Sequence, residues 1–290
     1  MTREILLGQA ASPRPVLYRR DRFAEFSGLL RQVAQMTEPP KGAYVEEAND
    51  DRRRLYHLAG NVAVIPIRGI LLNHFPYVGW PYATGYDALY CQFAQAFTDP
   101  EVKAIVSYIN SGGGEVAGCF DLVDWIAEAK VTDGKPVLAV LDECAFSAAY
   151  ALASAADSIA VPRTGGVGSI GVIMAHYDMS GWLKQVGLDV TLIKAGEHKA
   201  DGNAYEPLPE AVEEQWQADC EELRVLFCET VARNRSAAGV KVSVDQLMST
   251  EAAVFEGPLG LAAAIKLGLA DEVISARAAM NRVLDQMAGA

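Results

Sequence analysis

The chain has 290 residues, and its 25 Lys and Arg against 37 Asp and Glu give a formal net charge of −12. This charge argues against a general nucleic-acid binder, which needs a basic face to displace counterions from phosphates. Hydrophobic residues make up 51% of the chain and charged residues 21%. There is therefore ample apolar material for a folded core, and intrinsic disorder is excluded for most of the chain.

The sequence gives little indication of a membrane-spanning helix or of disulfide bonds. The longest stretch without charged residues, Gly69 to Tyr86, is interrupted by Asn73, His74 and two prolines, whereas a membrane-spanning helix needs about 20 mostly apolar residues. The N-terminus has no long apolar core of the signal-peptide kind. The five cysteines are scattered and form no CxxC pair, which favours free thiols over a disulfide frame or a zinc site. We therefore expect a cytoplasmic protein without a membrane span.

The first residues differ from the rest. Apolar residues recur at roughly helical spacing from Val16 to Met36, which predicts an amphipathic helix that ends at Glu38–Gly42. We assign residues 1–58 to an N-terminal helical arm that packs on its own domain or on a neighbouring subunit. Residues 59–275 are expected to form the main domain, and residues 276–290 a C-terminal tail.

Short apolar runs alternate with helical patterns from residue 61 onward. Such alternation predicts an α/β fold, in which parallel strands are joined by right-handed crossovers. The expected strands are Val62–Ile67, Ala104–Ile109, Pro136–Leu141, Ile159–Val161 and a segment near Val190–Ile193. The expected helices are Tyr86–Phe97, Glu115–Lys130, Ser147–Ala156 and a long helix from Pro209 to about Arg235.

A glycine-rich segment, Asn110 to Glu115, stands between a predicted strand and a predicted helix. Glycines there let the backbone approach a ligand, and the helix N-terminus would offer free N–H groups. Such a turn can bind a phosphate or stabilise an oxyanion, or it can be a plain tight turn. Gly112, Gly114 and Ala117 also satisfy the loose dinucleotide fingerprint, so an NAD-binding oxidoreductase is a rival interpretation.

Ser147 also stands at a strand-to-helix junction. A serine at a helix start is most often an N-cap, and the alternative is a nucleophile with neighbouring N–H groups aimed at the same carbonyl. A nucleophilic serine needs a base, and none of the four histidines has the flanking pattern of a Ser-His-Asp enzyme. A lysine in a loop is normally a solvated charge, but one in the segment Ile193–Asn203 can serve as the base if burial lowers its pKa towards neutrality. We expect the apolar wall for such burial around Ile193 and Val172.

Five motifs in their order resemble peptidase family S49, the signal peptide peptidase A family. They are Asn110–Gly114, Ser147–Tyr150, Gly168–Val172, Lys199 and Gly268–Asp271. The resemblance covers roughly residues 61 to 273. The segments Gly196–Pro209 and Thr250–Phe255 are most similar to the phage branch, that of the minor capsid protein C or prohead proteases.

The resemblance implies a role for each matched residue. Ser147 matches the nucleophile, Lys199 the general base and Ser169 the serine that orients the lysine. The oxyanion hole would be formed by Gly113 or Gly114 together with the N–H of Ala148. The implied fold is the ClpP/crotonase-like spiral of βαβ units, assembled into rings or domes by subunits that share clefts. Gly112 replaces a usual proline, and Ala148 and Ala149 replace a usual Gly-Gly.

We therefore expect a serine endopeptidase with a Ser/Lys dyad that needs no metal and no cofactor. Its expected substrates are scaffold or capsid proteins, cleaved by a homo-oligomer in the host cytoplasm within the prohead. Three alternatives stay open: a soluble bacterial signal-peptide peptidase, the oxidoreductase named above, and an inactive capsid-assembly protein that keeps the fold.

Overall fold

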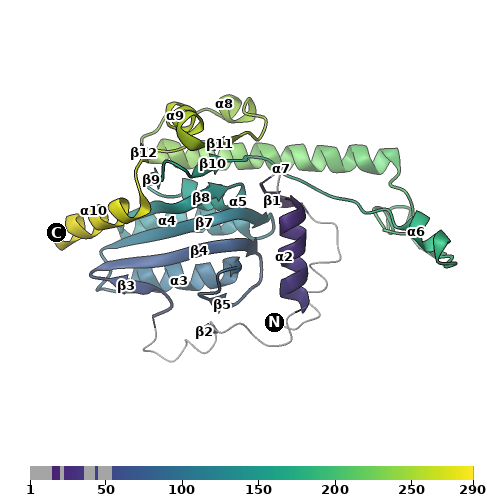
Figure 1. Ribbon diagram of the computed structural model, residues 1–290, viewed down its shortest axis with the longest axis horizontal. Coiled ribbons are helices and arrows are strands. Elements are labelled where there is room, and N and C mark those ends of the chain that lie inside the picture. Colours follow the sequence, from purple (N-terminus) through teal and green to yellow (C-terminus); the bar gives the residue numbers. More distant parts are fainter. Residues whose placement is uncertain (1–14, 20–22, 36–42, 45–53, 290) are drawn as a thin grey trace.

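The computed structural model describes residues 15–19, 23–35, 43–44 and 54–289. A mostly parallel sheet forms the centre of the molecule, with strands in the order β11-β10-β8-β7-β4-β3 (Figure 1). The strands are β1 (Val16–Tyr18), β2 (Ala43–Tyr44), β3 (His57–Ala59), β4 (Val62–Leu72), β5 (Tyr77–Val78), β6 (Ala83–Gly85), β7 (Ala104–Glu115), β8 (Val137–Phe146), β9 (Ser158–Val161), β10 (Gly166–Gly168), β11 (Val254–Glu256) and β12 (Glu272–Val273).

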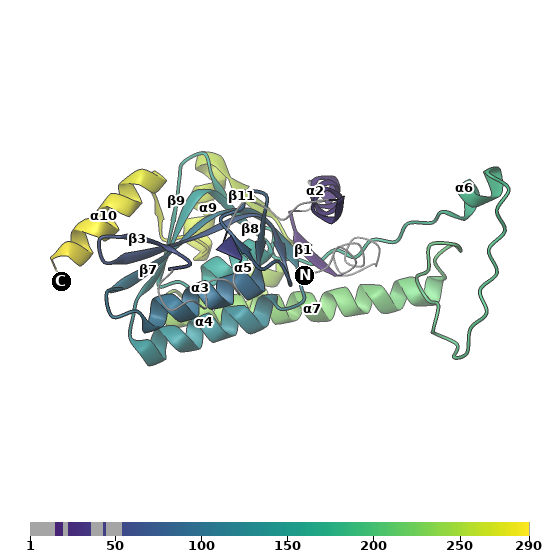
Figure 2. The same cartoon turned by 90° about the horizontal axis from the view of Figure 1, so that it is seen from below.

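Helices pack on both faces of this sheet. One face carries α3, α4, α5 and the C-terminal half of α7, and the opposite face carries α10 (Figure 2). The helices are α2 (Phe23–Gln35), α3 (Tyr86–Thr98), α4 (Cys119–Asp133), α5 (Ala148–Ser154), α6 (Ser180–Gln185), α7 (Glu210–Ala237), α8 (Val244–Met248), α9 (Gly257–Leu267) and α10 (Ala276–Ala288). Within the described ranges, no helix is both long and apolar enough to cross a membrane.

The predicted α/β class is confirmed. β4, β7 and β8 pair in parallel and are connected through α3 and α4, as the alternating sequence pattern predicted. Their central residues, such as Ile65, Val106 and Leu141, are fully buried or nearly so because helices cover both faces of the sheet. The buried parallel sheet therefore holds β7 and β8 side by side as far as the pair of Ser111 and Ala145.

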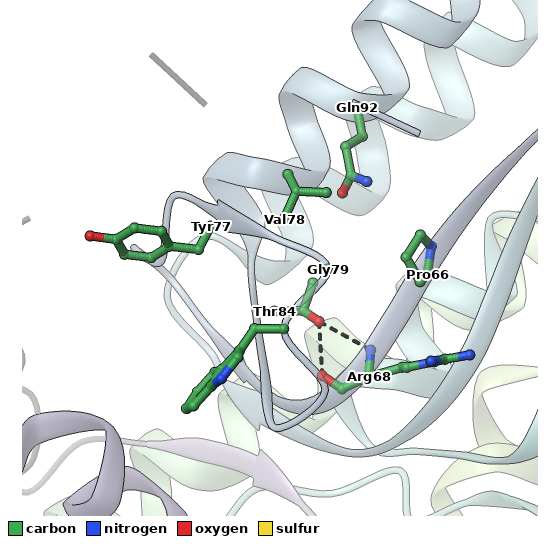
Figure 3. Close-up of a pocket in the computed structure, with 8 residues that line it drawn as sticks. Pro66, Arg68, Tyr77, Val78, Gly79, Thr84 and Gln92 are labelled. Carbon is green, nitrogen blue, oxygen red and sulfur yellow. Dashed lines mark hydrogen bonds between the residues drawn. The ribbon is translucent and has the colours of Figure 1, made fainter. Parts of the chain in front are cut away.

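The register of β4 shifts between Arg68 and Ile70, beside a small cavity (Figure 3). The hydroxyl of Thr84 accepts a hydrogen bond from the N–H of Arg68 and donates one to its carbonyl oxygen. Gly69 has a φ of 68° at this bulge. After the bulge, β4 and β7 pair again, with Ile70 opposite Gly113 and Leu71 opposite Gly114. The glycine segment of β7 is thus bound to β4 along one edge.

Two expected elements are wrong. Val16–Tyr18 is a strand, and the helix begins only at Phe23, because the Val-Leu-Tyr run finds a pairing partner on β7. The expected strand near Val190–Ile193 has no regular structure, and Ile193 is 97% exposed. The predicted helix stop at Glu38–Gly42 lies outside the described residues.

The N-terminal residues and the C-terminal helix both pack on the chain's own sheet. Phe26, Leu30 and Val33 of α2 join a buried cluster with Ile70 and Leu72 of β4. The expected C-terminal tail contains α10, whose Ala279 and Val283 pack against Val62, Ala104, Val106, Val140 and Ala160. The apolar face of α2 is thus covered within a single chain.

Residues 174–209, which we call the projecting segment, extend away from the sheet together with the N-terminal half of α7 (Figures 1 and 2). The segment contains α6 and packs mainly on itself and on α7. His176 Nε2 lies 2.8 Å from the carbonyl oxygen of Asn203, and its ring lies edge-on to Trp216 at 6.2 Å. A groove of about 420 Å³ separates the start of the segment from α7, between Val172 and Arg224.

Candidate active site

Ser147 lies at the sharp turn between β8 and α5. Its backbone has φ 54° and ψ −122°, a conformation that non-glycine residues rarely adopt. Ser147 occupies the N-cap position, but its side chain makes no capping hydrogen bond. The N-cap interpretation of this serine is therefore wrong. A strained strand-to-helix turn is the setting in which α/β hydrolases present a nucleophilic serine.

Ser147 and Ser169 are brought together at the ends of two neighbouring parallel strands, β8 and β10. The N–H of Ser147 donates to the carbonyl oxygen of Gly168 at 2.9 Å, and its Oγ donates to that of Gly171 at 3.4 Å. Ser169 also has a positive φ, 56°, and its N–H donates to the carbonyl oxygen of Ala253 at 2.8 Å. Both serines are buried.

The glycine segment does not form the expected turn at a helix N-terminus. Gly112, Gly113 and Gly114 lie inside β7, and α4 begins only at Cys119. The segment is extended because it pairs with β4 on one edge and with β1 on the other. A dinucleotide fingerprint needs these glycines to open a helix, so the oxidoreductase interpretation is wrong for this segment.

The glycines are required by the close approach of neighbouring strands. A Cβ on Gly113 would lie 2.1 Å from the carbonyl oxygen of Leu17 and 3.1 Å from that of Phe146. A Cβ on Gly114 would lie 1.9 Å from the carbonyl oxygen of Leu71. Gly113 therefore lies next to Phe146, the residue that precedes Ser147, and its N–H donates to Ser111 Oγ at 3.1 Å.

Ala148 and the buried cysteine next to it complete the surroundings of Ser147. Ala148 is the first residue of α5, so its N–H belongs to the donors that a helix leaves without intrahelical partners. The thiol of Cys119 lies 3.9 Å from the carbonyl oxygen of Ala148. Burial raises the pKa of Cys119 to about 12, so this thiol stays protonated and is no rival nucleophile.

Lys199 is not close to Ser147 within one chain. It lies in the projecting segment, between α6 and α7, and its side chain is exposed. The expected apolar wall is missing, since Ile193 points into solvent and Val172 lies at the base of the segment. The loop is nevertheless ordered: the N–H of Lys199 donates to the carbonyl oxygen of Gly196 at 3.3 Å, and Gly202 packs under Trp216.

Sequence reasoning missed residues 15–19, which run beside the glycine segment. Gly112 lies against the ring of Tyr18, and a Cβ at this glycine would be 2.9 Å from the ring. A short run of β-forming residues after a proline was the available signal, but the helical spacing that follows it obscured the strand. No feature of the sequence indicated that the carbonyl oxygen of Gly171 accepts a hydrogen bond from Ser147 Oγ.

A serine at a strained turn, with glycine backbone on one side and a second buried serine on the other, is typical of hydrolases that use a serine nucleophile. The comparisons with known proteins agree. The sequence profile of peptidase family S49 matches residues 129–289, which is more than half of the chain. The chain belongs to peptidase family S49.

Two phage proteins are among its relatives. The chain is 40% identical to the head-tail preconnector protein GP5 of Enterobacteria phage P21 over 79% of its own length and 44% of that protein. It is 38% identical to the capsid assembly protease C of Escherichia phage lambda over 81% of its length and 51% of that protein. The chain thus spans about half the length of these two relatives.

A solved structure, that of a membrane-bound stomatin-specific protease in complex with a substrate peptide, is similar at a TM-score of 0.43. It is 19% identical in sequence, and the match covers 75% of this chain and 77% of the other.

Proposed function

We propose that the protein is a serine endopeptidase in which Ser147 is the nucleophile and Lys199 the general base. The observation that supports this most is the strained, uncapped backbone of Ser147 between the glycines of β7 and Ser169. Ser147 Oγ attacks a peptide carbonyl, and Lys199 accepts its proton and passes it to the leaving amine. Water activated by Lys199 then hydrolyses the acyl-enzyme.

The oxyanion of the tetrahedral intermediate would be stabilised by backbone N–H groups of Gly113 or Gly114 and of Ala148. Each such donor contributes about 2.7–4 kcal/mol in enzymes where one has been removed. Ser169 would orient Lys199 through its hydroxyl. None of these steps uses a metal or a cofactor.

Lys199 and Ser147 lie far apart within a single chain. We therefore propose that Lys199 of one copy acts on Ser147 of a second copy. The projecting segment supports this role, since it leaves apolar side chains exposed that an interface would cover. These include Tyr177, Met179, Trp182, Leu188, Val190 and Ile193. A homo-oligomer would bury them and would bring the loop of Lys199 to the serine of its neighbour.

The names of the two phage relatives favour scaffold or capsid proteins as substrates and the prohead in the host cytoplasm as the place of action. Proteolysis at this site does not depend on that assignment, because the site residues alone define the reaction. A bacterial signal-peptide peptidase has no observation in the structure to favour it.

Variants of the dyad test the proposal. Ser147→Ala removes the nucleophile and Lys199→Ala removes the base, so each should abolish most cleavage of a casein-like protein. Lys199→Arg should not restore activity, because a guanidinium cannot accept the proton. The Ser147→Ala/Lys199→Ala double variant should be little worse than either single change, since the two residues act as a unit. An active-site serine probe should label the parent and not Ser147→Ala.

Lys194→Ala is the matched control, because Lys194 is an exposed lysine of the same segment and has no assigned role. Near-parental activity in Lys199→Ala would refute the dyad. An unlabelled parent without proteolysis would instead favour the inactive assembly protein.

A further inference from the structure

The carboxyl ends of β7 and β8 separate just before Ser147, and β1 fills the space between them. The last residue pair between these two strands is Ser111 with Ala145. Beyond it, the edge of β7 pairs with β1 instead, antiparallel, with Leu17 opposite Gly114 and Tyr18 opposite Gly113. Crevices at the carboxyl ends of parallel strands are where α/β proteins bind ligands.

The other edge of β1 contacts the segment that follows Ser169. Val16 and Ile173 exchange two backbone hydrogen bonds, each of 2.9 Å. The same segment contains Gly171, whose carbonyl accepts from Ser147 Oγ. Residues 16–18 thus form an extended strand that pairs with β7 along one edge, and Val16 bonds to Ile173 on the other edge. Ser147, which follows β8, is fully buried.

The side chains of β1 alternate as those of a bound peptide strand do. Leu17 belongs to the main core cluster together with Ala148 and Ile170, which neighbour the two serines in sequence. Val16 and Tyr18 point to the opposite side and join the α2 cluster.

Arg19, at the end of this strand, is bound to Glu256, the last residue of β11. Its guanidinium makes two hydrogen bonds to the carboxylate of Glu256, of 2.6 and 2.8 Å. It also lies 4.9 Å from the ring centroid of Phe146, the residue before Ser147. A carboxylate and an aromatic face together form a site that recognises a basic side chain.

From these contacts we infer that β1 occupies the channel of the peptide substrate and that Glu256 with Phe146 forms a subsite for a basic substrate side chain. An extended peptide can take the place of β1 because the backbone groups of Gly112, Val116 and Ile173, which bond to residues 15–19 in this structure, can bind any antiparallel strand. β1 therefore competes with the substrate and must leave before cleavage. This inference rests on the proposed peptidase function.

An engineered disulfide that fixes β1 in place tests whether β1 must move before cleavage. Val16 and Ile173 are directly paired and belong to the same side-chain cluster, so a Val16→Cys/Ile173→Cys variant is placed to cross-link. Oxidation should abolish casein cleavage, and reduction should restore it in full. The two single-cysteine variants, treated alike, control for the five native cysteines. A variant that is cross-linked by mass spectrometry and equally active in both states would overturn the inference.

Charge variants test two features separately: the Arg19–Glu256 ion pair that holds β1 in place, and the subsite for a basic substrate side chain. Arg19→Ala should raise cleavage several-fold, because β1 loses its bond to Glu256. Arg282→Ala, which removes a surface arginine paired with Glu272, should leave cleavage unchanged. A peptide with one arginine should be cleaved faster than its glutamine analogue by the parent and by Arg19→Ala. Glu256→Gln should abolish that preference.

The two failures are distinguishable. If the reduced double-cysteine variant and Arg19→Ala show no cleavage that depends on Ser147, the peptidase function itself is wrong. Suppose instead that both cleave in a Ser147-dependent way, but neither the disulfide nor the charge variants change the cleavage rate or the preference for the arginine peptide. Then only the proposed role of β1 and Glu256 is wrong.

Discussion

At the scale of single residues, the backbone carries information that residue types do not. Ser147 and Ser169 both have positive φ, which costs about 1–3 kcal/mol each and persists only where the surroundings impose it. The resemblance to family S49 matched Ser147 to a nucleophile, whereas the residue types alone favoured a capping serine. That distinction depends on a φ angle and on the absence of a capping bond at Ser147, both of which follow from tertiary packing.

Ser169→Ala should slow turnover while leaving the fold intact. If its hydroxyl orients Lys199, kcat should fall about 10-fold to 100-fold, the range for losing a hydrogen bond to a charged group. KM and the midpoint of thermal unfolding should change little, so the loss should appear in kcat alone. Ser154→Ala, a buried serine of α5 outside the site, is the control. Unaltered kinetics would remove Ser169 from the site.

At the scale of helices and strands, the central βαβ units were predictable and the peripheral strands were not. The first halves of β4, β7 and β8 are mostly buried apolar runs, so their pattern alone identifies them. Their second halves contain exposed polar residues such as Arg68 and Asn110 and were not predicted. β1 is three residues long, and it is a strand only because β7 and Ile173 supply partners far away in the sequence. Long-range pairing leaves no periodic signal in a short segment.

The C-terminal helix offers a stability test of the predicted domain boundary at residue 275. Val283 of α10 is buried against the sheet, so Val283→Ala should lower the free energy of unfolding by about 2 kcal/mol. Gln286→Ala, an exposed position of the same helix, should change it little. Denaturant unfolding measures both. Equal stability of the two variants would show that residues 276–288 are a tail outside the folded domain.

At the scale of the whole molecule, the projecting segment is the feature that a single chain does not explain. It carries Lys199 away from the sheet and exposes apolar side chains such as Trp182 and Ile193. The sequence predicted a dyad of Ser147 and Lys199 but not the separation of the two residues, because the distance between two motifs is set by the path of the chain between them. The second copy proposed above would account for both the exposure of these side chains and the separation of Lys199 from Ser147.

Mixing two inactive variants tests this account most directly. In an oligomer that pairs Ser147 of one copy with Lys199 of another, Ser147→Ala and Lys199→Ala subunits complement each other. Randomly mixed, refolded subunits should recover about a quarter of the parental activity, because one site in four then has both residues intact. Neither variant alone should show activity. Mixed oligomers that remain as inactive as the separate variants would contradict a dyad shared between subunits.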